Sequence, residues 1–70
     1  MIIKLDGRLY RQQAVEAAAV AYADVAAVKV RAGAQWIEAE VKGERSELDE
    51  ACGGDFEAEF CNHALWESGR

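Results

Sequence analysis

Residues able to do chemistry are few in this sequence, and most lie near its C-terminal end. Cys52, Cys61 and His63 belong to the types that bind zinc or act as nucleophile and base, and Glu59 lies four residues before His63. Structural zinc sites typically use two closely spaced pairs of ligands, and this spacing does not provide them. We therefore predict no metal site. Instead we expect two ordinary cysteines, buried or half-buried, and a surface contact between His63 and Glu59 on one helix face.

A disulfide bond between the two cysteines depends on the backbone between them. If residues 46–66 formed one continuous helix, Cys52 and Cys61 would lie ~13.5 Å apart along its axis, at 1.5 Å per residue. A disulfide bond needs Cα atoms within ~7 Å of each other, so a continuous helix would exclude it. The intervening pair Gly53-Gly54 could relax this limit.

Catalysis by this chain is not expected. The sequence holds one histidine and no recognisable set of nucleophile, base and orienting group. The acidic cluster Glu47, Asp49 and Glu50 lacks the pattern of a calcium loop, and no glycine-rich phosphate loop is present. We predict a protein that is not an enzyme and uses no cofactor.

Charge is distributed unevenly along the 70 residues, which carry a net charge of −5. The first 35 residues hold five basic and three acidic side chains, whereas residues 36–70 hold three basic and ten acidic ones. An acidic second half repels phosphate, which argues against nucleic acid and anionic membranes as partners. A basic protein surface would suit it better, although carboxylates also simply keep small proteins in solution.

The sequence shows no targeting signal and no stretch near the ~20 apolar residues of a membrane span. We expect a cytoplasmic protein, in which both thiols stay reduced.

A predicted β-hairpin at residues 27–42 organises the rest of the chain. Residues 28–31 and 36–41 alternate between apolar and mostly charged side chains, which is the period of a strand with one solvated face. The turn at residues 32–35 contains a glycine, as a tight reversal requires. The apolar face of this hairpin consists of Val28, Val30, Ile37, Ala39 and Val41.

Two helical regions are predicted to cover that face. After a short strand at residues 1–5, an alanine-rich helix should run from Tyr10 or Arg11 to Asp24, without a capping residue at its start. Both of its tyrosines, Tyr10 and Tyr22, are expected in the core or at its edge, with the hydroxyl reaching water. Val15, Ala18, Ala19 and Tyr22 share the face that would pack on the hairpin.

The second helical region is predicted to be broken by the double glycine. Ser46, with Asp49 three residues later, indicates the start of a short helix that Gly53-Gly54 ends. Asp55 should then cap a last helix that runs to about Trp66 or Glu67. The apolar stripe of that last helix is Phe56, Phe60, Ala64 and Leu65.

These elements predict one α+β domain over residues 1–70, a βαββα two-layer sandwich with both helical regions on one face of a three-stranded sheet. Strand order 1-3-2 would be half of a ferredoxin-like fold, and order 1-2-3 is the alternative. A chain of this size buries only about 60% of its unfolded surface, so a partner or a second copy would help to stabilise it.

One face of the predicted sheet stays open and could serve as a docking surface. It should carry Lys29 and Arg31 opposite Glu38 and Glu40, with Trp36 as the exception among these charges. That tryptophan could mark a partner surface or fold over the sheet edge. The unpaired backbone of the sheet edge is another docking site, for a second copy or for an extended peptide.

The C-terminal stretch Glu59-Phe60-Cys61-Asn62-His63-Ala64-Leu65, with Arg70 beyond it, resembles the ending of the small HxsD proteins of the His-Xaa-Ser system. That family carries a motif similar to Glu-Phe-x-Asn-x-x-Leu followed by a basic residue. Its strand, tyrosine and amphipathic helix also correspond here to Ile3, Leu5-Asp6, Tyr10, Ala14 and the helix to Tyr22. Arg11 and Ala64 stand where the family commonly has serine and leucine.

The resemblance implies an accessory role in a system in which a radical S-adenosylmethionine (SAM) enzyme modifies a precursor peptide with His-Xaa-Ser repeats. We expect a non-catalytic adaptor that binds the maturation enzyme or its precursor. A self-associating structural module, possible as a homodimer, is the alternative. The predicted partner-binding residues are Trp36, Phe60, Asn62, Leu65 and Trp66.

Overall fold

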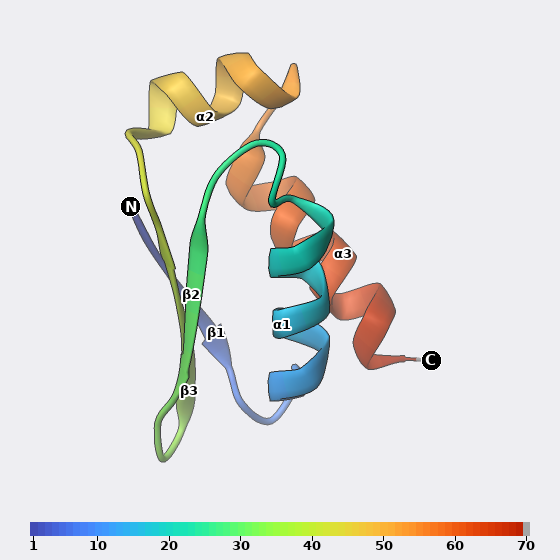
Figure 1. The fold of residues 1–70 in the computed structure, drawn as a ribbon. Coiled ribbons are helices and arrows are strands. Elements are labelled where there is room, and N and C mark those ends of the chain that lie inside the picture. The colour runs from blue at the N-terminus through green and yellow to red at the C-terminus, as the bar shows by residue number, and fades with distance from the viewer. Residues whose placement is uncertain (70) are drawn as a thin grey trace.

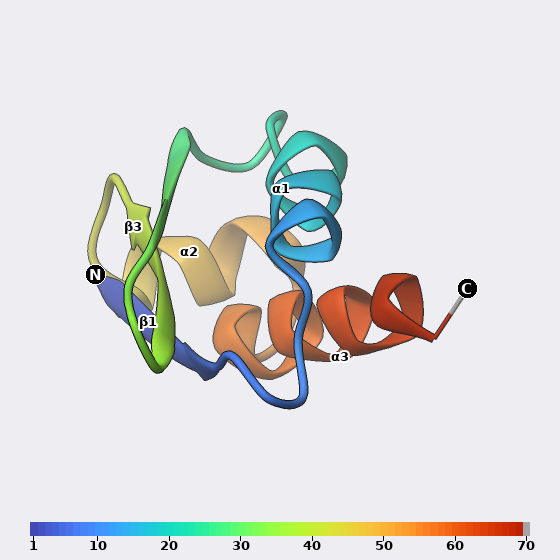
Figure 2. The same ribbon diagram turned by 90° about the horizontal axis from the view of Figure 1, so that it is seen from below.

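In a computed structural model that describes residues 1–69, three strands form one open sheet and helices pack against one of its faces (Figure 1). The elements follow in the order β1 (Ile2–Asp6), α1 (Gln12–Ala21), β2 (Val28–Ala32), β3 (Trp36–Val41), α2 (Arg45–Cys52) and α3 (Phe56–Ser68). Figure 2 shows α1 and α3 together on one side of the sheet, while the other side carries no helix. This arrangement confirms the predicted α+β class and the βαββα order, with the last helical region divided in two.

Strand β3 lies in the middle of the sheet, which has the order β1-β3-β2 and is antiparallel throughout. This is order 1-3-2, one of the two that the sequence left open. Ala39 faces Ile3 on one side and Val30 on the other, and Ile37 faces Leu5 and Ala32. Because side chains alternate between the faces of a strand, these rows point toward the helices.

The core is built mainly from β1, β3, α1 and α3. Ile3 and Leu5 are each 2% exposed, and Phe56 and Phe60 of α3 are fully buried. Val28 and Val30 were also expected on the apolar face of the hairpin, but they are only half-buried. The inner face of β2 is therefore less well covered than those of its neighbours.

Helix α1 ends at Ala21, three residues before its predicted end at Asp24. The chain turns after Tyr22, whose carbonyl oxygen accepts the N–H groups of Val25 and Ala26. Val25 and Ala26 then pack against the core, so tertiary contacts override the helix propensity of Ala23. The start of α1 lacks a side-chain cap, as predicted. The Ser68 hydroxyl of α3 instead accepts the N–H of Arg11 at 3.1 Å and donates to the Ala64 carbonyl at 2.9 Å.

The start of α2 differs from the sequence prediction, because Glu44 and not Ser46 is the cap. Glu44 and Glu47 form a reciprocal capping box, in which each side chain accepts a backbone N–H of the other residue. The double glycine ends the helix as predicted, with Gly53 in the left-handed region at φ 77°. Asp55 caps α3 by accepting the N–H of Ala58 at 3.1 Å, which was also predicted. Helix α3 continues to Ser68, slightly beyond its expected end.

Small side chains on α1 set how closely that helix approaches the core, and this leads to a stability prediction. Ala18 is fully buried, whereas Ala21 of the same helix is exposed. We expect Ala18→Leu to lower the free energy of unfolding by about 1–3 kcal/mol, because the added carbons must displace packed neighbours. The matched control Ala21→Leu should change it by less than about 0.5 kcal/mol. Urea unfolding followed by circular dichroism measures both, and equal effects would contradict close packing at Ala18.

Candidate interaction surfaces

The cysteines and the histidine predicted as the chemical residues do not converge on one site. Cys52 lies at the end of α2 with its Sγ 3.4 Å from the Glu59 carboxylate, and both cysteines are free thiols. His63 contacts Glu67 at 3.2 Å, so its predicted contact with Glu59 is wrong. Both glutamates lie four residues from His63, and Glu59 is instead directed toward Cys52. Within residues 1–69 no group of three or more metal-ligating side chains could hold an ion.

Both thiols are shifted toward the protonated form. Burial raises the pKa of Cys61, and the carboxylates of Glu57 and Asp55 add to the shift. Partial burial also raises the pKa of Cys52, with the neighbouring Glu59 carboxylate acting in the same direction. The thiolate is the nucleophile and the metal ligand, so neither cysteine is activated for such chemistry.

A chain of contacting rings runs from the core to the surface along α3. The Tyr22 ring contacts those of Phe56 and Phe60 at centroid distances of 5.6 and 6.0 Å, and that of His63 at 5.9 Å. The His63 ring then contacts Trp66 at 5.8 Å. Tyr22 is half-buried, which confirms its predicted place at the core edge. Trp66 is thus connected to fully buried rings by a series of edge-on and tilted ring contacts.

The outer side of α3 presents three of the five predicted partner-binding residues. Asn62 is exposed, and Leu65 and Trp66 are 49% and 59% exposed. At 100° per residue these positions fall on one face of the helix, opposite the buried face. We name Asn62, Leu65 and Trp66 the α3 surface. Arg70, the basic residue in the sequence resemblance to HxsD proteins, lies outside the described residues.

Phe60 does not belong to this surface, and its prediction as a partner contact needs correction. Its side chain is fully buried in the core cluster and stacks on Phe56 at 5.9 Å. A helical stripe read from sequence contains both core and surface residues, and apolar character alone does not separate them. The exposed residues of α3 lie on its other face.

Trp36 lies on the open face of the sheet, so it does not join the α3 surface. It is 49% exposed and stands opposite Asp6 of β1. Charges fill most of the same face in rows that cross the strands, with Lys4 and Arg31 on either side of Glu38. Arg31 makes a loose ion pair with Glu40 at 3.4 Å. The sheet and its core separate the two predicted contact areas.

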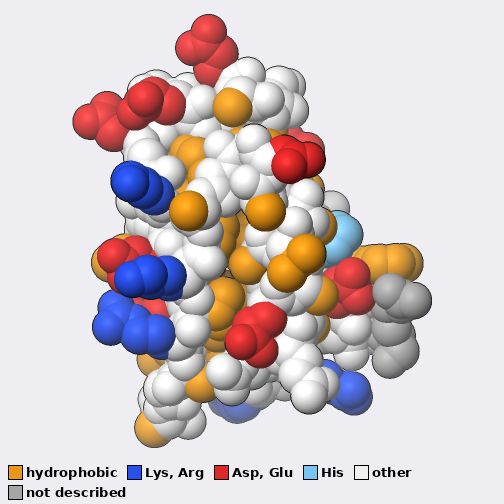
Figure 3. Space-filling model, viewed as in Figure 1, with side chains coloured by type: hydrophobic (Ala, Val, Ile, Leu, Met, Phe, Trp, Pro, Cys, Tyr) orange, Lys and Arg blue, Asp and Glu red, His pale blue; other side chains and the backbone are white. Residues whose placement is uncertain are grey.

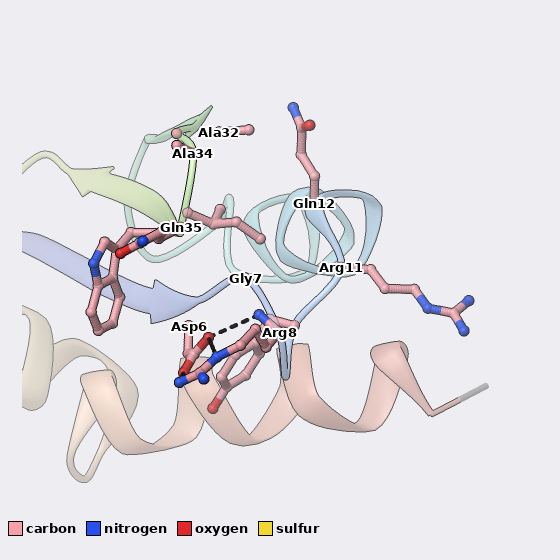
Figure 4. Close-up of a pocket in the computed structure, with 12 residues that line it drawn as sticks. Asp6, Gly7, Arg8, Arg11, Gln12, Ala32, Ala34 and Gln35 are labelled. Atoms are coloured by element: carbon pink, nitrogen blue, oxygen red, sulfur yellow. Dashed lines mark hydrogen bonds and ion pairs between the residues drawn. The ribbon is translucent and has the colours of Figure 1, made fainter.

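Two shallow depressions flank Trp36 at the end of the sheet where the β2–β3 turn lies. One, of about 460 Å³, is lined by residues that include Lys4, Arg31 and Glu38. The other, of about 540 Å³, lies between that turn and the β1–α1 connection (Figure 4). These linings were not predicted from sequence, because the two loops become neighbours only when β1 pairs with β3.

Four polar side chains of the larger depression are either paired with each other, as in Asp6 and Arg8, or directed outward, as in Arg11 and Gln12. Arg8 binds Asp6 through its guanidinium at 2.9 Å and also donates its backbone N–H, and this pairing lowers the pKa of Asp6. The side chains of Arg11 and Gln12 extend away from Gly7 and the depression (Figure 4). The Gly7 N–H donates a hydrogen bond to the Gln35 carbonyl at 2.9 Å. These four side chains therefore do not converge on a small-molecule site.

Comparison of the chain with family models, with curated proteins and with solved structures found no match. Among residues 1–69, no helix has the length and apolar character needed to cross a membrane.

The raised pKa values of the thiols lead to a reactivity prediction. We expect Cys52 and Cys61 to react with iodoacetamide at pH 8 more slowly than free glutathione, because less thiolate is present than in an unperturbed thiol. The rates should rise as the pH passes above the ordinary thiol value. Mass spectrometry of single Cys→Ser variants assigns the two rates, and a urea-unfolded sample provides the control. A native thiol that reacts faster than glutathione would contradict a raised pKa at its position.

Proposed function

We propose that this chain is a non-catalytic adaptor that binds a partner protein through the α3 surface. The observation that carries the proposal is the pair Leu65 and Trp66, two large apolar side chains that are about half exposed on adjacent positions. Tryptophan is enriched among the residues that dominate binding energy at protein interfaces. Asn62 beside this pair supplies a polar group that can fix the orientation of a partner.

The contacts that hold the Trp66 ring in place favour binding by a rigid surface. Its ring contacts His63, which also contacts Tyr22 and the Glu67 carboxylate. A side chain that is already held in place loses less conformational entropy on binding, so more of its contact energy appears as affinity. Val20 on α1 is more exposed than Trp66, but its side chain is short and aliphatic.

The system in which the adaptor works is proposed from the sequence resemblance to HxsD proteins. Its partner is then a radical SAM maturation enzyme or the precursor peptide of that enzyme. We place the protein in the cytoplasm, where such enzymes act and where both thiols stay reduced. The acidic character of the chain favours a basic partner surface.

The test is affinity capture from native lysate with matched surface variants. Wild-type protein should retain a protein that carries an iron–sulfur cluster or a small precursor peptide, identified by mass spectrometry and iron content. Trp66→Ser should abolish the capture, because hot-spot truncations cost about 2 kcal/mol or more. Val20→Ser is the control, since it removes an even more exposed apolar side chain outside the α3 surface. Recovery of neither protein class, or equal loss with both variants, would refute the proposal.

A self-associating module remains a second candidate, favoured by the open face of the sheet. Ile2 and Trp36 are 57% and 49% exposed there among alternating charges. Two copies joined through this face would bury both side chains and enlarge a thin core.

Light scattering coupled to size-exclusion chromatography separates the two candidates. A self-associating module should show a mass that rises with concentration, and Trp36→Ser should return it to the monomer. A constant monomer mass at all concentrations would discard this alternative and leave the adaptor proposal in place.

A further inference from the structure

The outer edge of β2 has backbone groups that no other segment uses. At the two ends of the β2–β3 ladder, the Ala27 carbonyl accepts the Lys42 N–H, and Gly33 donates its N–H to Trp36. Alternate residues of an antiparallel strand bond to the same neighbour, so Lys29 and Arg31 complete this ladder. The N–H and C=O groups of Val28, Val30 and Ala32 therefore point away from β3. Within residues 1–69 no other backbone hydrogen bond uses them.

The inner side chains at this edge are also incompletely covered. Val28 and Val30 are half-buried, and Ala32 is exposed, whereas Ile3 and Leu5 on the opposite edge strand are 2% exposed. Figure 3, which views the molecule as Figure 1 does, shows hydrophobic atoms at the surface between β2 and α1. A strand added beside β2 would cover this apolar strip with its own inward side chains.

The other face of β2 carries positive charge. Lys29 and Arg31 project from the open face of the sheet, where Arg31 makes only a loose ion pair with Glu40 at 3.4 Å and its side chain stays 68% exposed. Figure 3 shows basic side chains along one margin of this view, interspersed with acidic ones and beside the apolar strip. Along its other edge, β2 already pairs with β3, which places Glu40 opposite Lys29 and Glu38 opposite Arg31. The sequence of β3 thus shows which kind of strand pairs well with β2: one in which acidic residues alternate with apolar ones.

We propose that the outer edge of β2 binds an extended acidic peptide segment, in which glutamate or aspartate alternates with apolar residues. The peptide backbone pairs with Val28, Val30 and Ala32. Its carboxylates lie beside Lys29 and Arg31 on the open face, and its apolar side chains cover Val28 and Val30 on the helix side. This site is separate from the α3 surface and does not depend on the function proposed above.

The opposite edge, formed by β1, fits such a peptide less well. By the same alternation only Ile2, Lys4 and Asp6 direct backbone groups outward, and the Asp6 carbonyl already accepts the N–H groups of Leu9 and Tyr10. The inner side chains of β1 are fully covered, so an added strand gains little apolar burial there. The open-face side chains of β1 also include the carboxylate of Asp6, which opposes an acidic ligand.

The binding experiment uses a blocked, fluorescein-labelled peptide of about eight residues in which valine and glutamate alternate. Fluorescence anisotropy with the full chain at about 0.01 M ionic strength should show saturable binding, which salt weakens. A peptide that alternates valine and lysine should bind roughly tenfold more weakly or not at all. Failure of the valine–glutamate peptide to bind would overturn the proposal.

Two variants test the side chains of the site. The double variant Lys29→Gln/Arg31→Gln should weaken binding roughly tenfold. The control Lys4→Gln/Lys42→Gln removes the same amount of charge elsewhere and should leave the affinity nearly unchanged. Equal weakening by both pairs would reduce the effect to net charge and refute a site on β2. Trp66→Ser should not alter peptide affinity, so this test fails or succeeds independently of the adaptor proposal.

Amide hydrogen exchange locates the peptide on the backbone. The amides of Val28, Val30 and Ala32 should exchange more slowly with peptide bound. Protection of Ile2 and Lys4 instead would place the peptide on β1 and overturn the proposal. Slow exchange at β2 in peptide-free protein, together with a dimer mass by light scattering, would show that a second copy occupies this edge, which also overturns it.

Discussion

The double pairing of β3 is the constraint on which the rest of the structure depends. This strand bonds to β1 through one set of alternate residues and to β2 through the other, so it fixes the register of both neighbours. Its inner side chains Ile37, Ala39 and Val41 are at most 5% exposed, and Ala39 leaves room at the centre of the sheet for side chains from the helices. A shift of the pairing register by one residue would turn these apolar side chains toward solvent and direct Glu38 and Glu40 into the core.

The elements of this fold that the sequence predicts correctly are those marked by a local sequence pattern. Alternation located β2 and β3, and the double glycine with Asp55 located the break between α2 and α3, because each of these signals is local. The end of α1 was missed because Val25 and Ala26 are drawn to the core by contacts that no local pattern encodes. The capping box at Glu44 was missed because glutamate is an uncommon cap and Ser46 is a common one.

The candidate surfaces were only partly predictable for a similar reason. Sequence identified Leu65 and Trp66 as apolar residues on the last helix, but it could not separate them from the buried Phe60 without the packing partners of α3. The edge of β2 required the strand order and the burial of its inner side chains, which emerge only when β3 is placed in the middle. Contacts between distant segments decide which apolar residues remain available for binding. The two proposed surfaces therefore lie on different elements and can engage partners separately.

The place of α3 in the core has a consequence for synthesis of the protein on the ribosome. Phe56 and Phe60 are the largest fully buried side chains, and Ser68 also ties the end of α3 to the start of α1. A nascent chain that has emerged only as far as α2 can form the hairpin and α1, but it leaves the inner face of the sheet without its main cover. Closure of the core must await translation of α3, so folding is completed late and the exposed strands are open to chaperones until then.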